Sequence, residues 1–531
     1  MKQLYKSSNI IISVYLFVML GFFPIFYRYQ YAKMGDSKYK IFLYASSVCV
    51  VVSFLLSIIR LITSKAELVK NKNFVADKLN AREMTCLDTA VLIYFFCTTI
   101  SYVISPFKEA GFWGADGWKM GLLSQFLFVA IYFLIAKVWT FQKWTIGLLL
   151  VSSAIVYIIA IFHRFDIDLL PIYGNLKLEY KVQFLSTMGQ SSWYSSFLCT
   201  VFPIGLYLYF AEEDKKTRTV AGIYSGIALL SLVTQNTDSA FLSLFSVLMV
   251  LFYVSFEKKG KQFLQVIILI LASFGFMGIC QRVFESRMIP LDSFSILMSQ
   301  SVWIRIALAI AVIVYFLLYG MRFDKLAHNR LRLGKNSQII FWIILGMILI
   351  GILGVVVFII LNSNGWLLNK FDYQCTHNYL LFDDYWGNGR GFAWRFSATT
   401  FMELPFLQKL FGVGPDCFSA YAASVPEYLE QMRGFWGNLV LTNAHNEYLT
   451  KLYNIGIVGL VSYVVMLVTA VKTFMKERTG NPLLPAIAIS IVSYMVHNIF
   501  CYEQVCCTPF LYILMGIGSN LIHNKRKKST Y

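Results

Sequence analysis

The sequence predicts an all-α fold, a polytopic membrane helix bundle of about fourteen spans with a large structured extracytoplasmic loop. The chain of 531 residues is 58% hydrophobic and only 14% charged, a composition that excludes an ordinary soluble enzyme and a disordered protein. Apolar runs of about 18 residues or more recur along the chain, and about 20 such residues cross a hydrocarbon core. One stretch of about 90 residues, 362–451, interrupts this series and contains no span.

The apolar runs define the membrane elements in chain order. Most are long enough to be membrane helices by length and composition alone. The seventh and eighth runs are short and separated only by residues 235–239, which predicts a tight helical hairpin. The predicted spans are 10–26, 41–62, 86–105, 121–136, 145–162, 191–210, 219–234, 240–255, 263–280, 302–319, 339–361, 454–474, 483–500 and 508–523.

The distribution of basic residues predicts the orientation. The chain has 46 Lys and Arg against 28 Asp and Glu, but they lie in short loops between apolar runs, so we expect no nucleic-acid partner. With the basic tail 525–528 in the cytoplasm, an even number of spans places both termini there. The cytoplasmic segments then hold 27 Lys and Arg and the short outer loops hold 11, as the positive-inside rule requires. The first outer loop is an exception, with Arg28, Lys33, Lys38 and Lys40.

The spans divide the chain into three parts: residues 1–361 with eleven spans, the outer loop 362–451, and residues 452–531 with three spans and the tail. The outer loop is rich in Trp, Phe, Tyr and Gly, which indicates an ordered segment lying against the outer leaflet. Within it, the spacing of apolar residues predicts one helix from Gly391 to Leu404, ended by Pro405, and another from Pro426 to Met432. Its basic residues, on the side where few are expected, first indicate a function. They are Lys370, Arg390, Arg395, Lys409, Arg433 and Lys451.

The cysteines give a weaker prediction. The chain has ten, without the spacing of a zinc site. Cys375 and Cys417 both lie in the outer loop, where oxidation is possible, and are predicted to form a disulfide. His377 and the pair Asp383-Asp384 lack the spacing of metal ligands, so no metal is expected.

Three motifs in and after the outer loop contain polar residues that are candidates for binding or catalysis. The first, WGNGRGFAWRFSATTF, spans residues 386–401, and the second, LFGVGPDCFSAY, spans residues 410–421 and contains a Gly-Val-Gly-Pro turn. The third, NAHNEYLTKLYNIGIVGLVSYVVML, spans residues 443–467 and places His445 just before a span. A His there has the ordinary pKa of a general base, about 6.5. The alternative is an interfacial His that only caps the helix.

In this order, the three motifs resemble the O-antigen ligase and polymerase family of bacteria. The resemblance is specific over 386–467 and weaker at GADGWKMGLL, 114–123, and MGQSSWYSSFLCTVFPIG, 188–205. It implies a glycosyltransferase of the bacterial cytoplasmic membrane, with its active site on the outer side and neither metal nor cofactor. The implied reaction transfers a glycan, with inversion, from undecaprenyl diphosphate to an acceptor sugar. The implied partners are this lipid-linked donor, the glycan or glycolipid acceptor, and the bilayer.

The resemblance also implies roles for individual residues. His445 matches the proposed base, and Arg390 matches the loop arginine that holds the donor diphosphate. An Arg fork suits that group because it forms bidentate, charge-assisted bonds. Arg395 either binds the diphosphate as a second fork or only contacts a lipid headgroup at the surface. Asn446 and Glu447, next to the base, are expected to support it, and His445 and Arg390 are expected to face one cavity.

One position departs from the family pattern. The family has an arginine in an outer hairpin, whereas TQNTDSAFLSL, 234–244, has Asp238 at that place. Either Arg305, Arg164 or Arg282 replaces that arginine, or the donor is held differently, or the activity is altered. Asp238 itself is expected to cap the following helix, with pairing to Arg390 or assistance to His445 as alternatives.

Two other functions stay open at this point. A flippase for lipid-linked oligosaccharides also has up to fourteen spans, but transporter halves usually repeat, and this sequence shows no repeat. The chain could also be a non-catalytic relative of the enzyme, because Asp238 stands where the family has an arginine. The sequence specifies neither the sugar nor the acceptor, and it does not separate a polymerase from a ligase.

Overall fold

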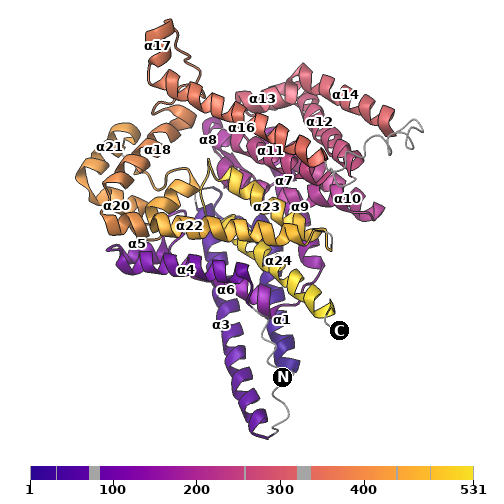
Figure 1. The fold of residues 1–531 in the computed structure, drawn as a ribbon, viewed down its shortest axis with the longest axis vertical. Helices are drawn as coiled ribbons and strands as arrows, with labels where there is room; N and C mark the ends of the chain where they lie inside the picture. The colour runs from indigo at the N-terminus through magenta and orange to yellow at the C-terminus, as the bar shows by residue number, and fades with distance from the viewer. Residues whose placement is uncertain are drawn as a thin grey trace.

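The computed structural model of the chain describes residues 2–31, 33–70, 84–255, 259–319, 336–437, 440–478 and 480–529. Their fold is almost entirely helical (Figure 1), so the predicted all-α class is confirmed. The one sheet among these residues is a two-stranded antiparallel pair, in which Phe184 pairs with Gln190 and Leu185 with Gly189.

The part before the outer loop consists of membrane helices joined by short elements. In chain order, its elements are α1 (Lys2–Phe17), the π-helix η1 (Val18–Phe22), α2 (Phe23–Ile25), α3 (Met34–Lys70), α4 (Cys86–Ile104), α5 (Lys108–Trp113), α6 (Leu122–Phe133), the π-helix η3 (Leu134–Val138), α7 (Trp144–Arg164), α8 (Leu178–Gln183), β1 (Phe184–Leu185), β2 (Gly189–Gln190), α9 (Ser191–Ala211), α10 (Lys215–Leu232), α11 (Asp238–Ser255), α12 (Gly260–Val283), the 3₁₀ helix η4 (Glu285–Arg287), α13 (Ser293–Gln300), α14 (Val302–Tyr319) and α16 (Asn336–Ser363).

The segment 362–446, called the outer segment below, folds into short helices. They are α17 (Trp366–Phe371), α18 (Trp386–Glu403), α19 (Phe406–Phe411), α20 (Phe418–Ser424) and α21 (Pro426–Trp436). Both helices predicted there are present, and Leu404 and Pro405 end α18 as expected. In Figure 1, α18, α20 and α21 gather at one side of the bundle. The chain ends with α22 (Glu447–Lys476), α23 (Leu483–His497) and α24 (Thr508–Ser529).

Every predicted span coincides with helix in the structure. Among the described residues, ten helices are long and apolar enough to cross a membrane, and Leu122–Val138 and Leu483–His497 are shorter apolar helices. The remaining two predicted spans correspond to α10 and α24. The chain is therefore a multi-pass membrane protein, whereas the count of fourteen and the orientation stay predictions.

One hydrophobic core joins the beginning and the end of the chain. The most apolar window of α9 is 89% buried, and α9 packs between α10 and α23. The same core takes in residues from α1 to α12 and from α22 to α24. The outer segment has a second core, built around Phe396, Phe418, Tyr428 and Met432 and completed by Tyr453 of α22. It is therefore an ordered unit attached to the start of α22.

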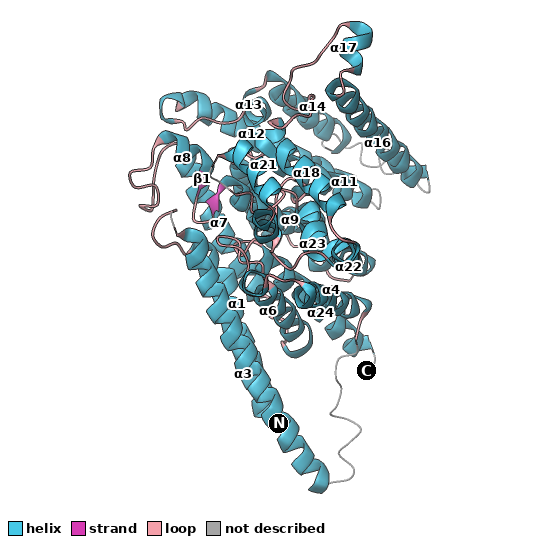
Figure 2. Ribbon diagram, turned by 90° about the vertical axis from the view of Figure 1, so that its left-hand side faces the viewer, coloured by secondary structure: helices cyan, strands magenta, loops and turns pink. Residues whose placement is uncertain are grey.

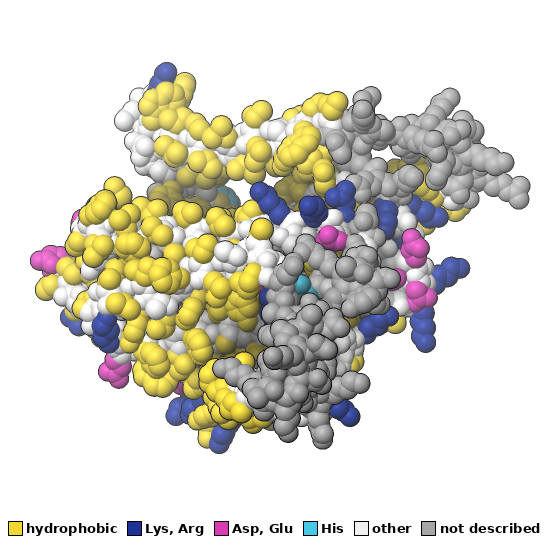
Figure 3. Space-filling model, turned by 60° about the horizontal axis from the view of Figure 1, so that its bottom comes forward, with side chains coloured by type: hydrophobic (Ala, Val, Ile, Leu, Met, Phe, Trp, Pro, Cys, Tyr) yellow, Lys and Arg dark blue, Asp and Glu magenta, His cyan; other side chains and the backbone are white. Residues whose placement is uncertain are grey.

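The helices α14 and α16 lie at the edge of the molecule, and their most apolar windows are 6% and 0% buried. Figure 2 shows both helices beside the main body. At one end of α16, the Phe341 ring lies 4.9 Å from the Tyr253 ring. At the other end, Asn362 Nδ2 donates to the carbonyl oxygen of Cys375 at 2.8 Å. Hydrophobic side chains also cover much of the described part of the face shown in Figure 3, as expected of a surface that contacts lipid.

The predicted disulfide is wrong, because Cys375 and Cys417 are both free. The Cys417 thiol is buried under α4, where Ser105 Oγ donates to its sulfur at 3.9 Å and the sulfur donates to the carbonyl oxygen of Phe107 at 3.7 Å. Cys375 is held elsewhere, with its backbone N–H donating to Asn362 Oδ1 at 3.0 Å. Each cysteine is fixed by a different part of the bundle.

Candidate functional site

The turn between α23 and α24 brings Arg390 and His445 together. Arg390 Nε donates to the carbonyl oxygen of Phe500 at 3.2 Å. The His445 ring packs edge-on against Tyr502, with the ring centroids 5.2 Å apart and the planes at 83°. Two residues that the sequence singled out thus border one short turn, residues 500–502, which no motif had indicated.

Three left-handed residues at the start of α18 position Arg390. Gly387, Asn388 and Gly389 have φ values of 57°, 61° and 85°, which glycine adopts readily and Asn tolerates. This turn brings the carbonyl oxygen of Gly387 to Arg390 Nη1, which donates to it at 2.7 Å. Arg390 Nη2 makes no hydrogen bond to a described residue. Burial lowers the pKa of Arg390, and the nearby Asp238 carboxylate acts in the opposite direction, so the guanidinium stays charged.

His445 is held in the form that a general base needs. Its φ of 48° is left-handed, and its backbone N–H donates to Asn443 Oδ1 at 2.8 Å. Burial lowers the pKa of His445 to about 4, and the charge of Arg390 acts in the same direction, so the ring is neutral at physiological pH. Neither ring nitrogen bonds a described residue. The helix cap is Asn446, whose Oδ1 accepts from the N–H of Leu449 at 3.0 Å, so the alternative of a capping His is wrong.

Glu447 fastens the start of α22 to the chain after α23. Its buried carboxylate accepts hydrogen bonds from the hydroxyl of Tyr494 at 3.0 Å, from the hydroxyl of Tyr463, and from the side-chain amide of Asn498. Its backbone N–H donates to the carbonyl oxygen of Asn498 at 3.0 Å. The carboxylate therefore fixes the position of His445 relative to the 500–502 turn, although it faces the bundle.

Two glycine motifs of the sequence contact each other. The backbone N–H of Gly414 donates to the carbonyl oxygen of Asn454 at 2.9 Å. A Cβ on Gly412 would lie 2.2 Å from that same oxygen, and a Cβ on Gly456 would lie 2.3 Å from the carbonyl carbon of Leu410. At Gly456, with φ 70° and ψ −177°, the helical course of α22 is interrupted. The Gly-Val-Gly-Pro turn therefore docks on a break in α22.

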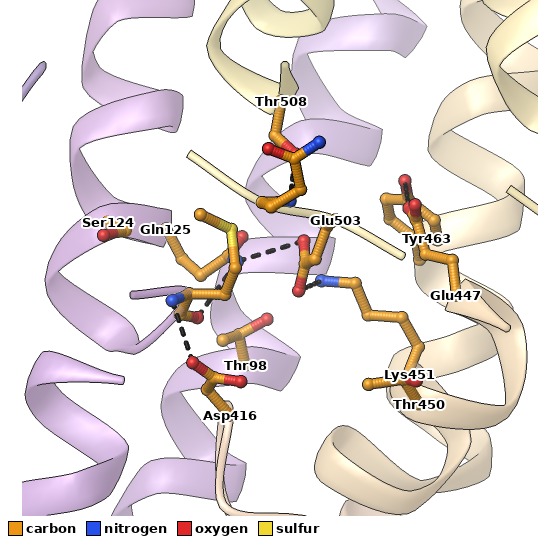
Figure 4. A network of polar contacts seen from close by, with 12 residues as sticks. Thr98, Ser124, Gln125, Asp416, Glu447, Thr450, Lys451, Tyr463, Glu503 and Thr508 are labelled. Atoms are coloured by element: carbon orange, nitrogen blue, oxygen red, sulfur yellow. Dashed lines mark hydrogen bonds and ion pairs between the residues drawn. The ribbon is translucent and has the colours of Figure 1, made fainter. Parts of the chain in front are cut away.

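A buried polar network lies behind this break, shown in Figure 4. Lys451 Nζ forms an ion pair with Glu503 Oε1 at 2.6 Å and donates to the hydroxyl of Tyr94, also at 2.6 Å. Gln125 Nε2 donates to Glu503 Oε2 at 3.3 Å. This pair was not predicted, because Lys451 was counted with the basic residues of the outer loop, before the span expected from residue 454. In the structure α22 begins at Glu447, so Lys451 lies within the helix and is buried, where a charged residue needs a counter-ion.

Asp416 joins the outer segment to the loop before α6. Its Oδ2 accepts hydrogen bonds from the N–H groups of Ala115 at 2.7 Å and Met120 at 2.9 Å. Burial raises the pKa of Asp416 to about 7; these two bonds oppose the rise, and the nearby Glu503 adds to it. In the sequence, Asp416 stands out only as the residue after the Gly-Val-Gly-Pro turn.

The other predicted arginines lie elsewhere. Arg395 is 59% exposed in its side chain and pairs with Asp384 at 2.7 Å. Arg305 is exposed on α14, and Arg282 Nη2 donates to the carbonyl oxygen of Gln300 at 2.9 Å. Arg164 is fully buried and its Nε donates to the carbonyl oxygen of Thr234 at 2.7 Å, so it supports the outer hairpin. None of them is brought to the 500–502 turn.

Asp238 contacts the outer segment instead of capping α11. Its Oδ2 accepts a hydrogen bond from the hydroxyl of Tyr379, and its buried Oδ1 has no hydrogen-bond partner among the residues that the structure describes. No capping bond from its own helix is present among the described residues, so the expected cap is wrong.

Residues 288–464 match the family model described as O-antigen ligase. The resemblance to the O-antigen ligase family is therefore confirmed over this third of the chain. The matched part begins before α13 and ends within α22, so it contains Arg390, the docked glycine motifs and His445, but not the 500–502 turn. No curated protein matches the chain.

Proposed function

We propose that the chain is a membrane glycosyltransferase that transfers a glycan from undecaprenyl diphosphate to an acceptor sugar, as a polysaccharide polymerase or ligase. The reaction takes place at the outer face of the bacterial cytoplasmic membrane, with both termini in the cytoplasm. The observation that carries the proposal is the arrangement at the 500–502 turn. There Arg390 donates from Nε to the backbone of Phe500, and the neutral ring of His445 packs against the ring of Tyr502. Among the described residues, neither Arg390 Nη2 nor the His445 ring has a hydrogen-bond partner.

In the proposed mechanism, the acceptor hydroxyl donates its proton to His445 and its oxygen attacks the anomeric carbon of the donor sugar. The bond from that carbon to the diphosphate oxygen breaks, and the electron pair leaves with the diphosphate. A single displacement of this kind inverts the anomeric carbon and needs no carboxylate nucleophile, unlike retaining glycosidases. Arg390 stabilises the negative charge that grows on the leaving group. As in the family, the reaction is proposed to proceed without metal.

Asp238 has a secondary role in this scheme. It occupies the hairpin position where the family carries an arginine, and like charges would keep it from binding diphosphate directly. Its charge favours the protonated guanidinium of Arg390. We therefore assign diphosphate binding to Arg390 and leave Arg395 and Arg305 outside the proposed centre, since Arg395 pairs with Asp384 and Arg305 lies exposed on α14.

The test is the His445→Ala variant in cells and in purified form. If His445 is the general base, transfer falls by roughly 10²–10⁴-fold, and the lipid-linked glycan accumulates on the outer side. Arg390→Lys is also expected to lower transfer, because an ammonium cannot reproduce the planar fork. His377→Ala is the matched control, since His377 is an exposed histidine of the outer segment.

Two outcomes would contradict the proposal. Near-normal polysaccharide in cells with a well-expressed His445→Ala variant would exclude His445 as the base. Accumulation of the lipid-linked glycan on the cytoplasmic side would instead indicate a flippase.

A further inference from the structure

A pocket of about 430 Å³ opens in the outer segment directly before Arg390. This volume falls within the range of about 300–1,000 Å³ typical of small-molecule sites. No charged side chain of the described residues lines the pocket, so it suits a neutral group. Its lining residues are Asn378, Tyr385, Asn388, Gly389, Phe435 and Trp436.

The aromatic side of the pocket is anchored on α18. The Phe435 ring stacks on Phe392, with the centroids 4.5 Å apart and the planes at 1°. Tyr385 lies 5.2 Å from Phe435, and Trp436 meets Phe435 edge-on at 4.9 Å. Gly389 allows this arrangement, because a Cβ there would lie 2.5 Å from the Trp436 ring. The pocket thus has a fixed aromatic wall at the tip of the turn that presents Arg390.

Tyr385 differs from the other rings because it is 73% exposed. An exposed ring beside a packed aromatic wall leaves apolar area available to a ligand. Two further lining residues are polar, and the side-chain amides of Asn378 and Asn388 make no hydrogen bond to a described residue. Rings that pack against C–H groups, next to free amide donors and acceptors, match the two surfaces of a pyranose: its apolar face and its hydroxyl rim.

We infer that this pocket is a carbohydrate subsite that holds one pyranose ring of the glycan beside Arg390. The inference rests on the proposed function, because it assigns the neutral sugar next to the diphosphate that Arg390 binds. Either the donor glycan or the acceptor glycan can supply this ring. The pocket recognises the sugar part, whereas Arg390 recognises the charged part, so the two contributions are separable by mutation.

The experiment measures binding of labelled oligosaccharide fragments of the producing cell's own polysaccharide to the full chain in lipid nanodiscs. Tyr385→Ala is expected to weaken binding about three- to tenfold, the equivalent of one aromatic contact. Tyr385→Phe keeps the ring and retains binding. Asn388→Gly removes the amide but tolerates the left-handed backbone, and is also expected to weaken binding. Phe406→Ala, at an equally exposed ring of α19, is the matched control and binds normally.

Transfer kinetics then identify the source of the ring. In the Tyr385→Ala variant, a higher KM for the undecaprenyl-diphosphate glycan with an unchanged kcat assigns the pocket to the donor. The same change for the lipid-free acceptor assigns it to the acceptor. Unchanged binding and unchanged KM values for both substrates would overturn the inference and leave the proposed function intact. If wild-type protein binds the oligosaccharide, Tyr385→Ala weakens this binding, and no transfer occurs, the subsite stands and the proposed function fails.

Discussion

Replacing Gly456 by Ala tests whether docking of the Gly-Val-Gly-Pro turn on α22 holds the outer segment in place. The added Cβ would lie 2.3 Å from both the carbonyl carbon and oxygen of Leu410 and 2.4 Å from the backbone nitrogen of Phe411. Backbone cannot yield as a flexible side chain can, so overpacking costs about 1–3 kcal/mol. The conformation at φ 70° and ψ −177° adds about 1–3 kcal/mol for a residue with a Cβ. The docked state is therefore destabilised by about 2–6 kcal/mol.

Cys417 reports this change because its thiol is buried directly after the docked turn. Maleimide labelling at Cys417, followed by peptide mass spectrometry, measures how often the turn opens. A loss of about 2 kcal/mol corresponds to roughly thirtyfold faster labelling, since each 1.4 kcal/mol is a factor of ten. Gly434→Ala is the matched control. That glycine lies in α21 with no atom within 4 Å of an added Cβ, so its variant is expected to label at the wild-type rate. Equal labelling rates in both variants would refute the docking argument.

Three further predictions concern titration and burial. The acid limb of kcat/KM is expected near pH 4, because the rate falls as His445 gains a proton; Arg390→Gln should move it to higher pH by removing a positive neighbour. Glu447→Ala leaves three donors without an acceptor and should destabilise the protein by about 3–5 kcal/mol. Thermal unfolding measures this loss, which should be smaller in the Glu447→Gln variant. Burial raises the pKa of Asp416 from 3.8 in the unfolded chain to about 7 in the folded protein. The free energy of unfolding should therefore fall as pH rises from about 4 to about 7, by at most about 1.4 kcal/mol per pH unit. Asp416→Asn should flatten this slope in unfolding curves measured across pH.

Much of the helical framework could be predicted because hydropathy is a local property. Each apolar run became helix, and Pro405 ended α18 where its missing N–H and fixed φ required. Local patterns also predicted a helix from Pro426 to Met432, and in the structure this helix runs on to Trp436. The number of helices that cross the bilayer was less predictable, since α10 and α24 are helical without matching the composition of a long apolar span.

The interior of the site could not be predicted, since its contacts join residues far apart in the chain. Lys451 was predicted as one of the basic residues of the outer loop, and Glu503 had no predicted role, yet the two form an ion pair inside the bundle. Arg390 and His445 were singled out from motifs, but the 500–502 turn that they share has no signal of its own. The disulfide prediction failed for the same reason: a shared compartment does not bring Cys375 and Cys417 together.

The dependence of the outer segment on α22 also orders the biogenesis of the protein. Tyr453 completes the hydrophobic core of the outer segment, with its ring 4.7 Å from Phe418. The ribosome makes Phe418 before Tyr453, and Asn498, the partner of Glu447, later still. While these residues are missing, the outer segment exposes the apolar surface that they cover, and in the proposed orientation this surface faces proteases outside the membrane. We therefore expect a nascent chain stopped before α22 to be a substrate for quality control, and the outer segment to become protease-resistant only once the last helices have been inserted.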